Sequence, residues 1–308
     1  MEVIDAQVHL NHIHPEARTA EMESIVAAAI AAMDAVGVDG VVVSEFWGFG
    51  DTRRRDEVAP GVFRSRYPFS ELAADKHPER FTYHTMIGLN DPDLEGQVAA
   101  LRTKPGAMAL RIVPTPETGA IDRMAKGEFE PFFAAAERHQ VPVFCWLPGR
   151  SHLLVRYLDQ FPKLQFILDH CGVGQAPYRL GPTAPTLVSS VVETRAERVR
   201  QFDAVAELAR YPNLALKWCH APNLFSEQSY PYRDAIPVLR KAIQAFGADR
   251  VMWASDYTQA RTEMGITWAQ ALYYVLESDQ LSDTEKEWLL GGSVRKALRW
   301  PKELGASA

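Results

Sequence analysis

Polar residues that could carry acid–base chemistry follow several short apolar runs of the chain. Asp5, Gln7 and His9 alternate along the first run, so a strand would place all three on one face, with Gln7 and His9 at its end. His170 follows a later run, and Asp256 follows the last one. A carboxylate can take a proton from water, and imidazoles can donate hydrogen bonds to a developing oxyanion. We therefore predict that Asp256, His170 and His9 are catalytic and that Gln7 contributes to substrate binding.

Two cationic side chains belong to the same pattern. Arg111 lies in the fourth apolar run and Lys217 in the seventh. Buried charges are rarely tolerated without a partner or a function, and both cations can bind an anionic group, Arg through two parallel hydrogen bonds. We predict that both bind the substrate. The alternatives are that Arg111 pairs with Asp5 or Asp169 inside the protein and that Lys217 neutralises Asp256.

Eight apolar runs, rich in β-branched and aromatic residues, alternate with helical stretches. Their nearly continuous hydrophobicity is typical of parallel strands buried on both faces. Eight such strands with intervening helices, and no linker between them, predict an α/β fold, a (β/α)8 TIM barrel forming one domain over residues 1–308. The carboxyl ends of the strands meet at one rim of such a barrel, where the polar residues would converge. The runs are 3–8, 40–44, 81–87, 107–113, 141–147, 164–169, 213–218 and 250–255.

The segments between the runs carry apolar residues at helical spacing. One apolar stripe stops at Gly37, a left-handed helix end, and another ends at Gly247. No GxGxxG sequence follows the first strand, so the sequence does not support a nicotinamide dinucleotide cofactor.

Three of the predicted rim loops are long, at residues 45–68, 171–194 and 220–233. Long loops in a compact domain are usually lids or binding walls. Their aromatic residues favour an apolar or ring-shaped ligand, although the same residues could equally seal the loops onto the barrel. We include Trp47 among the substrate-binding residues, together with Trp146, His220 and Tyr257 from the strand ends. The loop aromatics are Trp47, Phe49, Phe63, Tyr178, Phe225, Tyr230 and Tyr232.

Composition narrows the function classes further. The 308 residues are 47% apolar and carry a net charge of −6, without a basic cluster, which argues against nucleic-acid binding. No apolar run approaches the roughly 18 residues of a membrane span, and Glu2 and Asp5 stand where a signal peptide carries basic residues. We expect a cytoplasmic protein. Cys145, Cys171 and Cys219 are too widely spaced for a cysteine zinc motif, and we expect buried free thiols.

An ordered set of motifs extends along nearly the whole chain. The first strand reads Asp5-Ala6-Gln7-Val8-His9, and the last ends in Ser255-Asp256. With these motifs the chain resembles the amidohydrolase-related branch of the amidohydrolase superfamily, metal-dependent hydrolases with a TIM barrel whose first strand usually reads Asp-x-His-x-His and whose last ends in Ser-Asp or Thr-Asp. Further similar segments are 37–43, 109–111, 142–143, 161–172, 214–217 and 291–300.

The resemblance implies four metal-ligand positions, and two of them differ here. Gln7 replaces the first histidine, and Trp146 or a neighbour stands at the fifth-strand position, whereas His9 and Asp256 match the family. A catalytic zinc needs about three protein ligands and an open position. We therefore favour no bound metal. A single divalent ion such as zinc, if present, would use His9, Asp256 and His170, with Gln7 offering at most a weak neutral oxygen.

The same branch is similar to metal-independent lactonases such as 2-pyrone-4,6-dicarboxylate lactonase, in which side chains polarise the ester carbonyl. We therefore expect a hydrolase of a cyclic or conjugated carboxylic ester, with water activated by Asp256 and the carbonyl polarised by His, Lys and Arg side chains. The expected substrate is a small anionic molecule with a cyclic or aromatic skeleton. The alternatives are a mononuclear metal-dependent amidohydrolase or aromatic-acid decarboxylase, and a ligand-binding barrel without catalysis. Aromatic residues of the C-terminal helices, around Trp268–Leu276 and Trp288, could also face a second copy in a homo-oligomer, although we favour their packing on the outer ring of the barrel.

Overall fold

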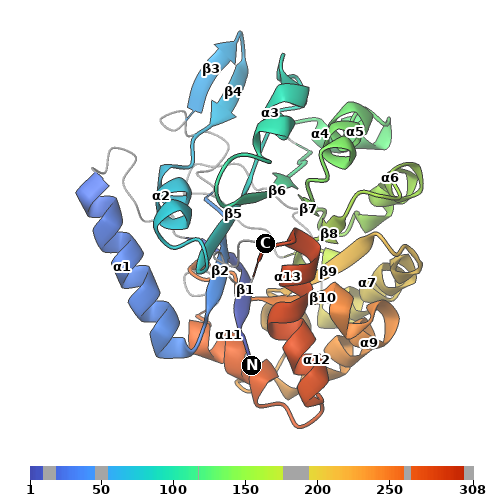
Figure 1. Ribbon diagram of the computed structural model, residues 1–308. Helices are drawn as coiled ribbons and strands as arrows, with labels where there is room; N and C mark the ends of the chain where they lie inside the picture. Colours follow the sequence, from blue (N-terminus) through green and yellow to red (C-terminus); the bar gives the residue numbers. More distant parts are fainter. Residues whose placement is uncertain (10–18, 46–54, 117, 176–193, 260–264, 302–308) are drawn as a thin grey trace.

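Eight parallel strands form the barrel that the sequence predicts (Figure 1). The computed structural model describes residues 1–9, 19–45, 55–116, 118–175, 194–259 and 265–301. The strands are hydrogen-bonded in the order β1-β2-β5-β6-β7-β8-β9-β10, so each pairs with the next strand of the barrel along the chain. All eight predicted strands are confirmed, with ends that differ by a few residues. Their bounds are β1 (Ile4–Val8), β2 (Gly40–Val43), β5 (Phe81–Thr85), β6 (Ala107–Ile112), β7 (Val143–Cys145), β8 (Phe166–Leu168), β9 (Leu214–Cys219) and β10 (Val251–Ala254).

Amphipathic helices surround the barrel, and α9 (Ile236–Phe246) shows how they pack. Its predicted apolar stripe, which includes Leu239 and Ile243, is buried, and the helix ends at Gly247 with a positive φ of 84°. No described helix has both the length and the apolar character that a membrane span needs. The other helices are α1 (Thr19–Val36), α2 (Pro68–Lys76), α3 (Leu94–Ala100), α4 (Ala120–Ala125), α5 (Glu130–Arg138), α6 (Val155–Gln160), α7 (Arg195–Glu207), α8 (Ala221–Phe225), α11 (Trp268–Leu276), α12 (Asp283–Glu287) and α13 (Ser293–Leu298). Shorter helical turns are η1 (Ser151–Leu154), η2 (His170–Gly172), η3 (Leu208–Arg210), η4 (Arg233–Ala235), η5 (Ala248–Arg250) and η6 (Trp288–Gly292).

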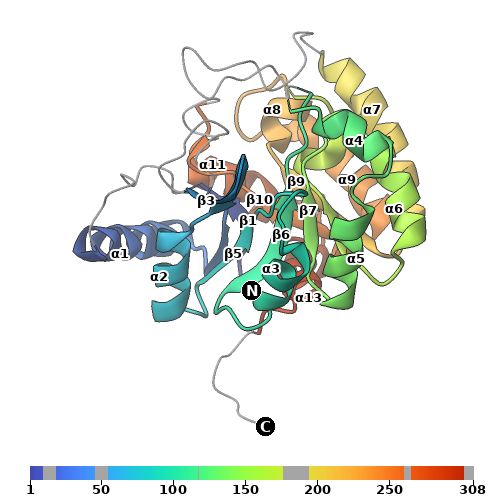
Figure 2. The same cartoon turned by 90° about the horizontal axis from the view of Figure 1, so that it is seen from above.

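The barrel interior, away from the carboxyl ends of the strands, is filled with apolar side chains and covered by α13. Val42, Phe144 and Ile167 point inward and form one buried cluster with Leu298 and Trp300 of the C-terminal segment. Accordingly, α13 crosses the barrel opening in Figure 1. Figure 2 shows α8 at the opposite end, where the strands finish. The apolar cluster therefore leaves only the carboxyl ends of the strands for polar chemistry.

The barrel closes between β1 and β10 around a buried aspartate. Within the described residues, the two strands are joined by one isolated bridge, between Val8 and Tyr257. Asp5 accepts hydrogen bonds from the backbone N–H of Ser255 at 3.0 Å, from its hydroxyl, and from the indole N–H of Trp268 at 2.8 Å. This carboxylate therefore fastens β1 to the end of β10 and to α11.

The placement of Asp5 corrects one expectation. The period of two places Asp5 on the same face as Gln7 and His9, but the pairing of β1 with β2 shifts register between Asp5 and Val8. Asp5 consequently contacts Ser255 and the indole of α11, whereas Gln7 and His9 contact other partners in the barrel mouth.

Residues 45–68 are not entirely a loop. They contain an antiparallel hairpin, β3 (Arg55–Ala59) and β4 (Val62–Ser65), which projects from the barrel in Figure 1. The hairpin turns at Pro60-Gly61, where Gly61 has a φ of 73°. A Pro-Gly pair between two short strand-like segments is a turn signal that the sequence offers. In a second rim loop, Phe225 is fully buried and stacks on Trp218, so it seals that loop onto the barrel.

The barrel closure gives a prediction about pH. Burial raises the pKa of Asp5 to about 6, although its hydrogen bonds from Ser255 and Trp268 oppose the shift. Because the folded pKa lies above the unfolded value of about 3.9, the folded state binds more protons between these values, and the contribution of Asp5 to stability falls as pH rises from about 4 to about 6. We expect the unfolding free energy of the wild type, relative to Asp5→Asn, to fall by about 2–3 kcal/mol over this interval and then to level off.

Urea denaturation of both proteins at closely spaced pH values measures this difference. Ser278→Ala, which removes no titratable group, should show a constant difference from the wild type. A constant difference for Asp5→Asn as well would contradict the raised pKa.

Candidate active site

The alternation of side chains along β9 shows how the barrel places polar groups in its mouth. Trp218 points outward, where its ring stacks on Phe225. Lys217 and Cys219, one residue to either side, therefore face the interior. Lys217 is fully buried, and Cys219 belongs to the interior cluster.

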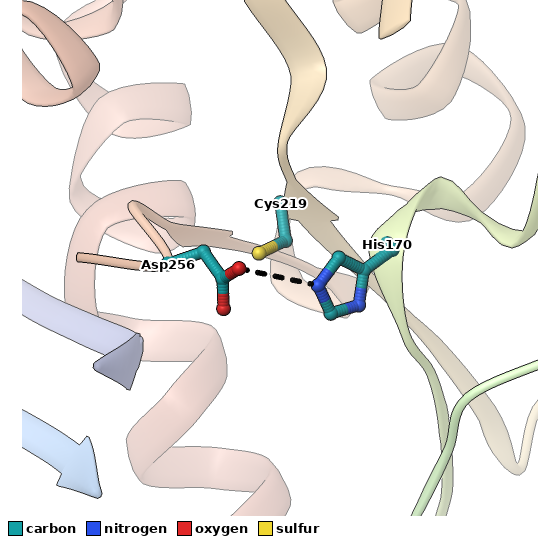
Figure 3. Close-up of side chains that lie close together, drawn as sticks. All are labelled: His170, Cys219 and Asp256. Atoms are coloured by element: carbon teal, nitrogen blue, oxygen red, sulfur yellow. Dashed lines mark ion pairs between the residues drawn. The ribbon is translucent and has the colours of Figure 1, made fainter. Parts of the chain in front are cut away.

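Asp256 lies at the centre of the candidate site. Its Oδ1 accepts a hydrogen bond from the amide nitrogen of Gln7 and is 3.0 Å from Nε2 of His9. Its Oδ2 contacts Nε2 of His220 and lies 3.7 Å from Nε2 of His170, which faces it in Figure 3. The structure thus brings together the three predicted catalytic residues. His220, which the sequence assigns only to substrate binding, also contacts the carboxylate directly.

Three of these residues have an unusual backbone conformation. His170, His220 and Asp256 have φ values of 50°, 57° and 56°, in the left-handed region. Residues other than glycine adopt this region rarely and at a cost of about 1–3 kcal/mol each. Each one lies just beyond the end of β8, β9 or β10, so the chain turns sharply there and directs the side chain over the barrel mouth. Strained residues at three adjacent strand ends indicate a functional site.

The charges of the site are set by burial and by the imidazoles. Burial alone would raise the pKa of Asp256, but His220 and His9, together with the hydrogen bonds of His170 and His220, hold it well below its usual range. Burial lowers the pKa of His170 to about 3, against the opposing effect of Asp256. Near neutral pH the site therefore contains an ionised carboxylate beside a neutral imidazole.

A second charged cluster lies next to the first. Asp169 is 2.7 Å from Nζ of Lys217 and 2.9 Å from Nε of Arg111, and Arg111 also donates to the hydroxyl of Ser44 at 2.9 Å. Burial would raise the pKa of Asp169, but the two cations lower it. The sequence leaves open which carboxylates Arg111 and Lys217 pair with. In the structure, both pair with Asp169. Nη2 of Arg111 has no hydrogen-bond acceptor among the described residues.

Gln7 connects the two clusters through its amide. The ammonium group of Lys217 can only donate, so the Gln7 oxygen that it contacts must be the acceptor. The amide nitrogen of Gln7 is then directed toward Asp256. The sequence allows the Gln7 oxygen at most a weak contact with a metal, and in the structure this oxygen accepts from Lys217. Gln7 is therefore a hydrogen-bond donor toward the centre of the site.

The remaining predicted binding residues surround this core. Trp146 is buried and donates its indole N–H to Gln175 at 3.2 Å. Tyr257 stacks on Trp268 with a centroid distance of 4.7 Å. Trp47 lies outside the described residues.

Two residues next to the site, Cys219 and His84, are not among the site residues predicted from the sequence. Cys219 lies beside Asp256 and His170, and the inward position of Lys217 two residues earlier is the signal that predicts its direction. Burial, with a contribution from Asp256, raises the pKa of this thiol well above its usual value, so a nucleophilic thiolate is not expected. His84 is buried beside Phe144, and neither ring nitrogen has a partner among the described residues.

The donor set of the site fits a zinc ion. Three imidazole nitrogens, from His9, His170 and His220, are directed at the two oxygens of one carboxylate. Imidazole nitrogen and carboxylate oxygen are common zinc ligands in catalytic sites. Of the predicted ligand set, His170 and Asp256 offer donor atoms within 4.8 Å of one another, together with Cys219, whereas His9 lies on the other oxygen of the same carboxylate.

The family of the chain follows from a comparison with known sequences. A sequence profile of the amidohydrolases matches residues 4–300, almost the entire chain. The chain belongs to the amidohydrolase family. The resemblance seen in the motifs is thereby confirmed, and no curated protein matches the chain.

Solved structures of other proteins share the fold over nearly their full length. An amidohydrolase from Burkholderia multivorans with bound zinc is 17% identical and has a TM-score of 0.68, covering 98% of this chain and 100% of that one. A protein from Pseudomonas putida, proposed to be a 2-pyrone-4,6-dicarboxylic acid hydrolase, is 17% identical with a TM-score of 0.64 and covers 98% and 99%. A 5-carboxyvanillate decarboxylase from Sphingomonas paucimobilis is 17% identical with a TM-score of 0.62 and covers 97% and 99%. At these identities the likeness shows the barrel fold.

The buried ion pair below the site gives a stability prediction. Lys217→Met leaves Asp169 with Arg111 alone and removes the donor to Gln7. Removing one partner from a buried pair typically costs about 3–5 kcal/mol, because the remaining charge is buried without compensation. We expect a loss of this size in the free energy of unfolding, measured by urea denaturation.

The matched control is Lys241→Met, which removes a lysine from an exposed pair with Asp203. This change should alter the free energy of unfolding by less than about 1 kcal/mol. Equal losses for the two variants would show that the Lys217 pair does not stabilise the fold.

Proposed function

We propose that this amidohydrolase hydrolyses a cyclic or conjugated carboxylic ester, of the lactone type, that carries an anionic group. The observation that supports this best is the buried Asp256 carboxylate, held ionised with three imidazoles around it. A site of this kind supplies an acceptor for a proton of water and several donors to a carbonyl oxygen.

Asp256 activates water in this mechanism. It takes one proton while the water oxygen attacks the ester carbon, and the electron pair of the C=O bond moves to the carbonyl oxygen. Collapse of the tetrahedral intermediate breaks the bond to the ring oxygen, which receives the proton and leaves as a hydroxyl group. The low pKa of Asp256 keeps the carboxylate ionised at neutral pH, so that it is available to accept a proton. General-base catalysis of this kind contributes about 10²–10⁴-fold.

The imidazoles stabilise the negative charge that develops on the carbonyl oxygen. His170 is neutral near pH 7 and can donate one N–H, and His9 and His220 lie on the same carboxylate. Removing one oxyanion donor typically costs about 10²–10³-fold in rate. Lys217 assists indirectly, since its contact with the Gln7 oxygen keeps the Gln7 amide nitrogen directed into the site.

The side chains alone suit an ester with a good leaving group better than an amide. Zinc, when bound, supplies Lewis-acid polarisation of a carbonyl and a more acidic water. Of the predicted ligands, His170 and Asp256 would hold it, and His9 and His220 lie on the same carboxylate. This donor set also supports the second candidate, a metal-dependent amidohydrolase or a decarboxylase of an aromatic acid. The Sphingomonas paucimobilis neighbour is a 5-carboxyvanillate decarboxylase.

Arg111 supplies the recognition of an anionic substrate. Its Nε and Nη1 are fixed by Asp169 and Ser44, which hold the guanidinium plane in one orientation. Its Nη2, without an acceptor among the described residues, can donate to a substrate carboxylate. Lys217 is fully buried on Asp169 and Gln7, so we assign the substrate contact to Arg111.

The first functional prediction concerns Asp256. In Asp256→Asn the proton acceptor is lost while the side-chain volume is retained, so lactone turnover should fall by about 10²–10⁴-fold in kcat. The assay uses a panel of lactones with and without carboxylate groups, with base consumption followed at constant pH. Asp203→Asn, an exposed carboxylate, should retain wild-type activity.

Release of carbon dioxide from aromatic acids, measured in parallel, separates decarboxylation from hydrolysis. Wild-type turnover of the aromatic acids without turnover of any lactone would favour the second candidate. Turnover of neither set, at any metal loading, would favour a barrel that binds ligands without catalysis.

The second prediction concerns charge selectivity. Dicarboxylate lactones should raise the Tm of the wild type, whereas neutral lactones of the same ring size should not. A ligand at 100 times its Kd stabilises by about 2.7 kcal/mol, which a thermal-shift assay detects readily. Arg111→Lys retains the charge but loses the forked geometry, so it should weaken the anionic ligands about tenfold or more. Arg138→Lys, on the exposed surface, is the control, and an equal response to neutral ligands would contradict this role of Arg111.

A further inference from the structure

We propose that Cys219 is a zinc ligand, so that a metal ion in this site is held by His170, Cys219 and Asp256. Figure 3 shows the three side chains directed at one another, with the Cys219 sulfur beside the carboxylate oxygen that faces His170. One ligand atom from each lies within 4.8 Å of the others, and all three residues are buried. The proposal concerns the same site as the proposed hydrolase but does not depend on it, because metal binding is measured without substrate.

The three cysteines of the chain differ in how their thiols are used. Cys145 donates to the carbonyl of Val143 at 3.7 Å, and Cys171 donates to the carbonyl of Cys219 at 3.6 Å. Both belong to the apolar layer between strands and helices. The Cys219 thiol has no hydrogen-bond partner among the described residues and lies inside the barrel. Only this thiol is directed at charged and imidazole groups.

Cys219 supplies a ligand that the other strand ends do not. The oxygen of Gln7 is engaged by Lys217. Trp146, at the end of β7, carries only an indole N–H and has no lone pair to offer a metal. Cys219 provides sulfur, which binds zinc at about 2.3 Å. Sulfur from Cys219, nitrogen from His170 and oxygen from Asp256 would make three protein ligands and leave the fourth position to water, the composition of a catalytic zinc site.

Zinc binding by Cys219 requires only the loss of the thiol proton. The S–H bond of Cys219 breaks, the sulfur lone pair forms the bond to zinc, and the thiol proton is released to solvent. Donor atoms around a tetrahedral zinc ion lie closer together than 4.8 Å, so small side-chain movements accompany binding. His220 follows Cys219 directly and contacts the same carboxylate oxygen as His170, which leaves its imidazole next to the open position.

Cobalt(II) in place of zinc gives the decisive measurement. Titration of chelator-treated wild-type protein should produce a sulfur-to-cobalt charge-transfer band in the near ultraviolet that saturates at one equivalent. In Cys219→Ser this band should be absent, and the zinc Kd, measured by competition with a coloured chelator, should rise about 100-fold or more, since loss of an outer partner alone costs 10–100-fold.

Matched variants keep the test independent of folding and of activity. The double variant Cys145→Ala and Cys171→Ala retains only the Cys219 thiol, and it should keep the band. If Cys219→Ser fails to fold, the band in the double variant still identifies the ligand. Absence of the band in wild-type protein would overturn the proposal. So would tight binding by Cys219→Ser that His9→Asn abolishes, because the ion would then be held on the β1 side. Loss of lactone hydrolysis with the band intact would contradict the proposed function alone.

Discussion

The amide of Gln7 is the interaction on which the rest of the site depends. It accepts from Lys217 and donates to Asp256, so it joins the ion pair of Asp169 to the carboxylate in the barrel mouth. An amide group can serve both neighbours only in one orientation, because an ammonium group never accepts and an ionised carboxylate never donates. The cation therefore fixes the amide, and the amide fixes one oxygen of Asp256. Each buried charge in this chain of contacts is compensated by a neighbour, as burial requires.

The fold maintains this arrangement through the way its strands end. Backbone strain at His170, His220 and Asp256 is stable only when the surroundings hold each turn in place. The backbone N–H of Asp256 donates to the carbonyl of Gln7 at 3.0 Å, and that of Leu224 donates to the carbonyl of His220 at 3.0 Å. The contacts that close the barrel between β1 and the end of β10 therefore also orient the active-site side chains.

The sequence predicts the barrel well because its signal is repetitive. Eight apolar runs, each long enough for one buried strand, locate the strand ends to within a few residues, and with them His9, His170 and Asp256. The irregular features of the fold are harder to predict from the sequence. A register shift in β1 separates Asp5 from Gln7 and His9, and no local sequence pattern indicates this shift. The partner of Lys217 could not be chosen either, since Asp169 and Asp256 both end neighbouring strands and only the three-dimensional distances distinguish them. The sequence does contain the signals for two other features. The turn at Pro60-Gly61 predicts the hairpin β3–β4, and the period of two along β9 predicts the inward direction of Cys219.

The two positions that depart from the family pattern have a common physical consequence. Gln7 and Trp146 stand where the resemblance implies histidine ligands, on β1 and at the end of β7. In this chain Gln7 donates hydrogen bonds to the carboxylate, and the indole of Trp146 donates to Gln175. The groups with lone pairs for water, substrate or metal therefore gather on β8, β9 and β10, with His9 as the contribution from β1. The three imidazoles among these groups all face Asp256, which is the common neighbour of the site.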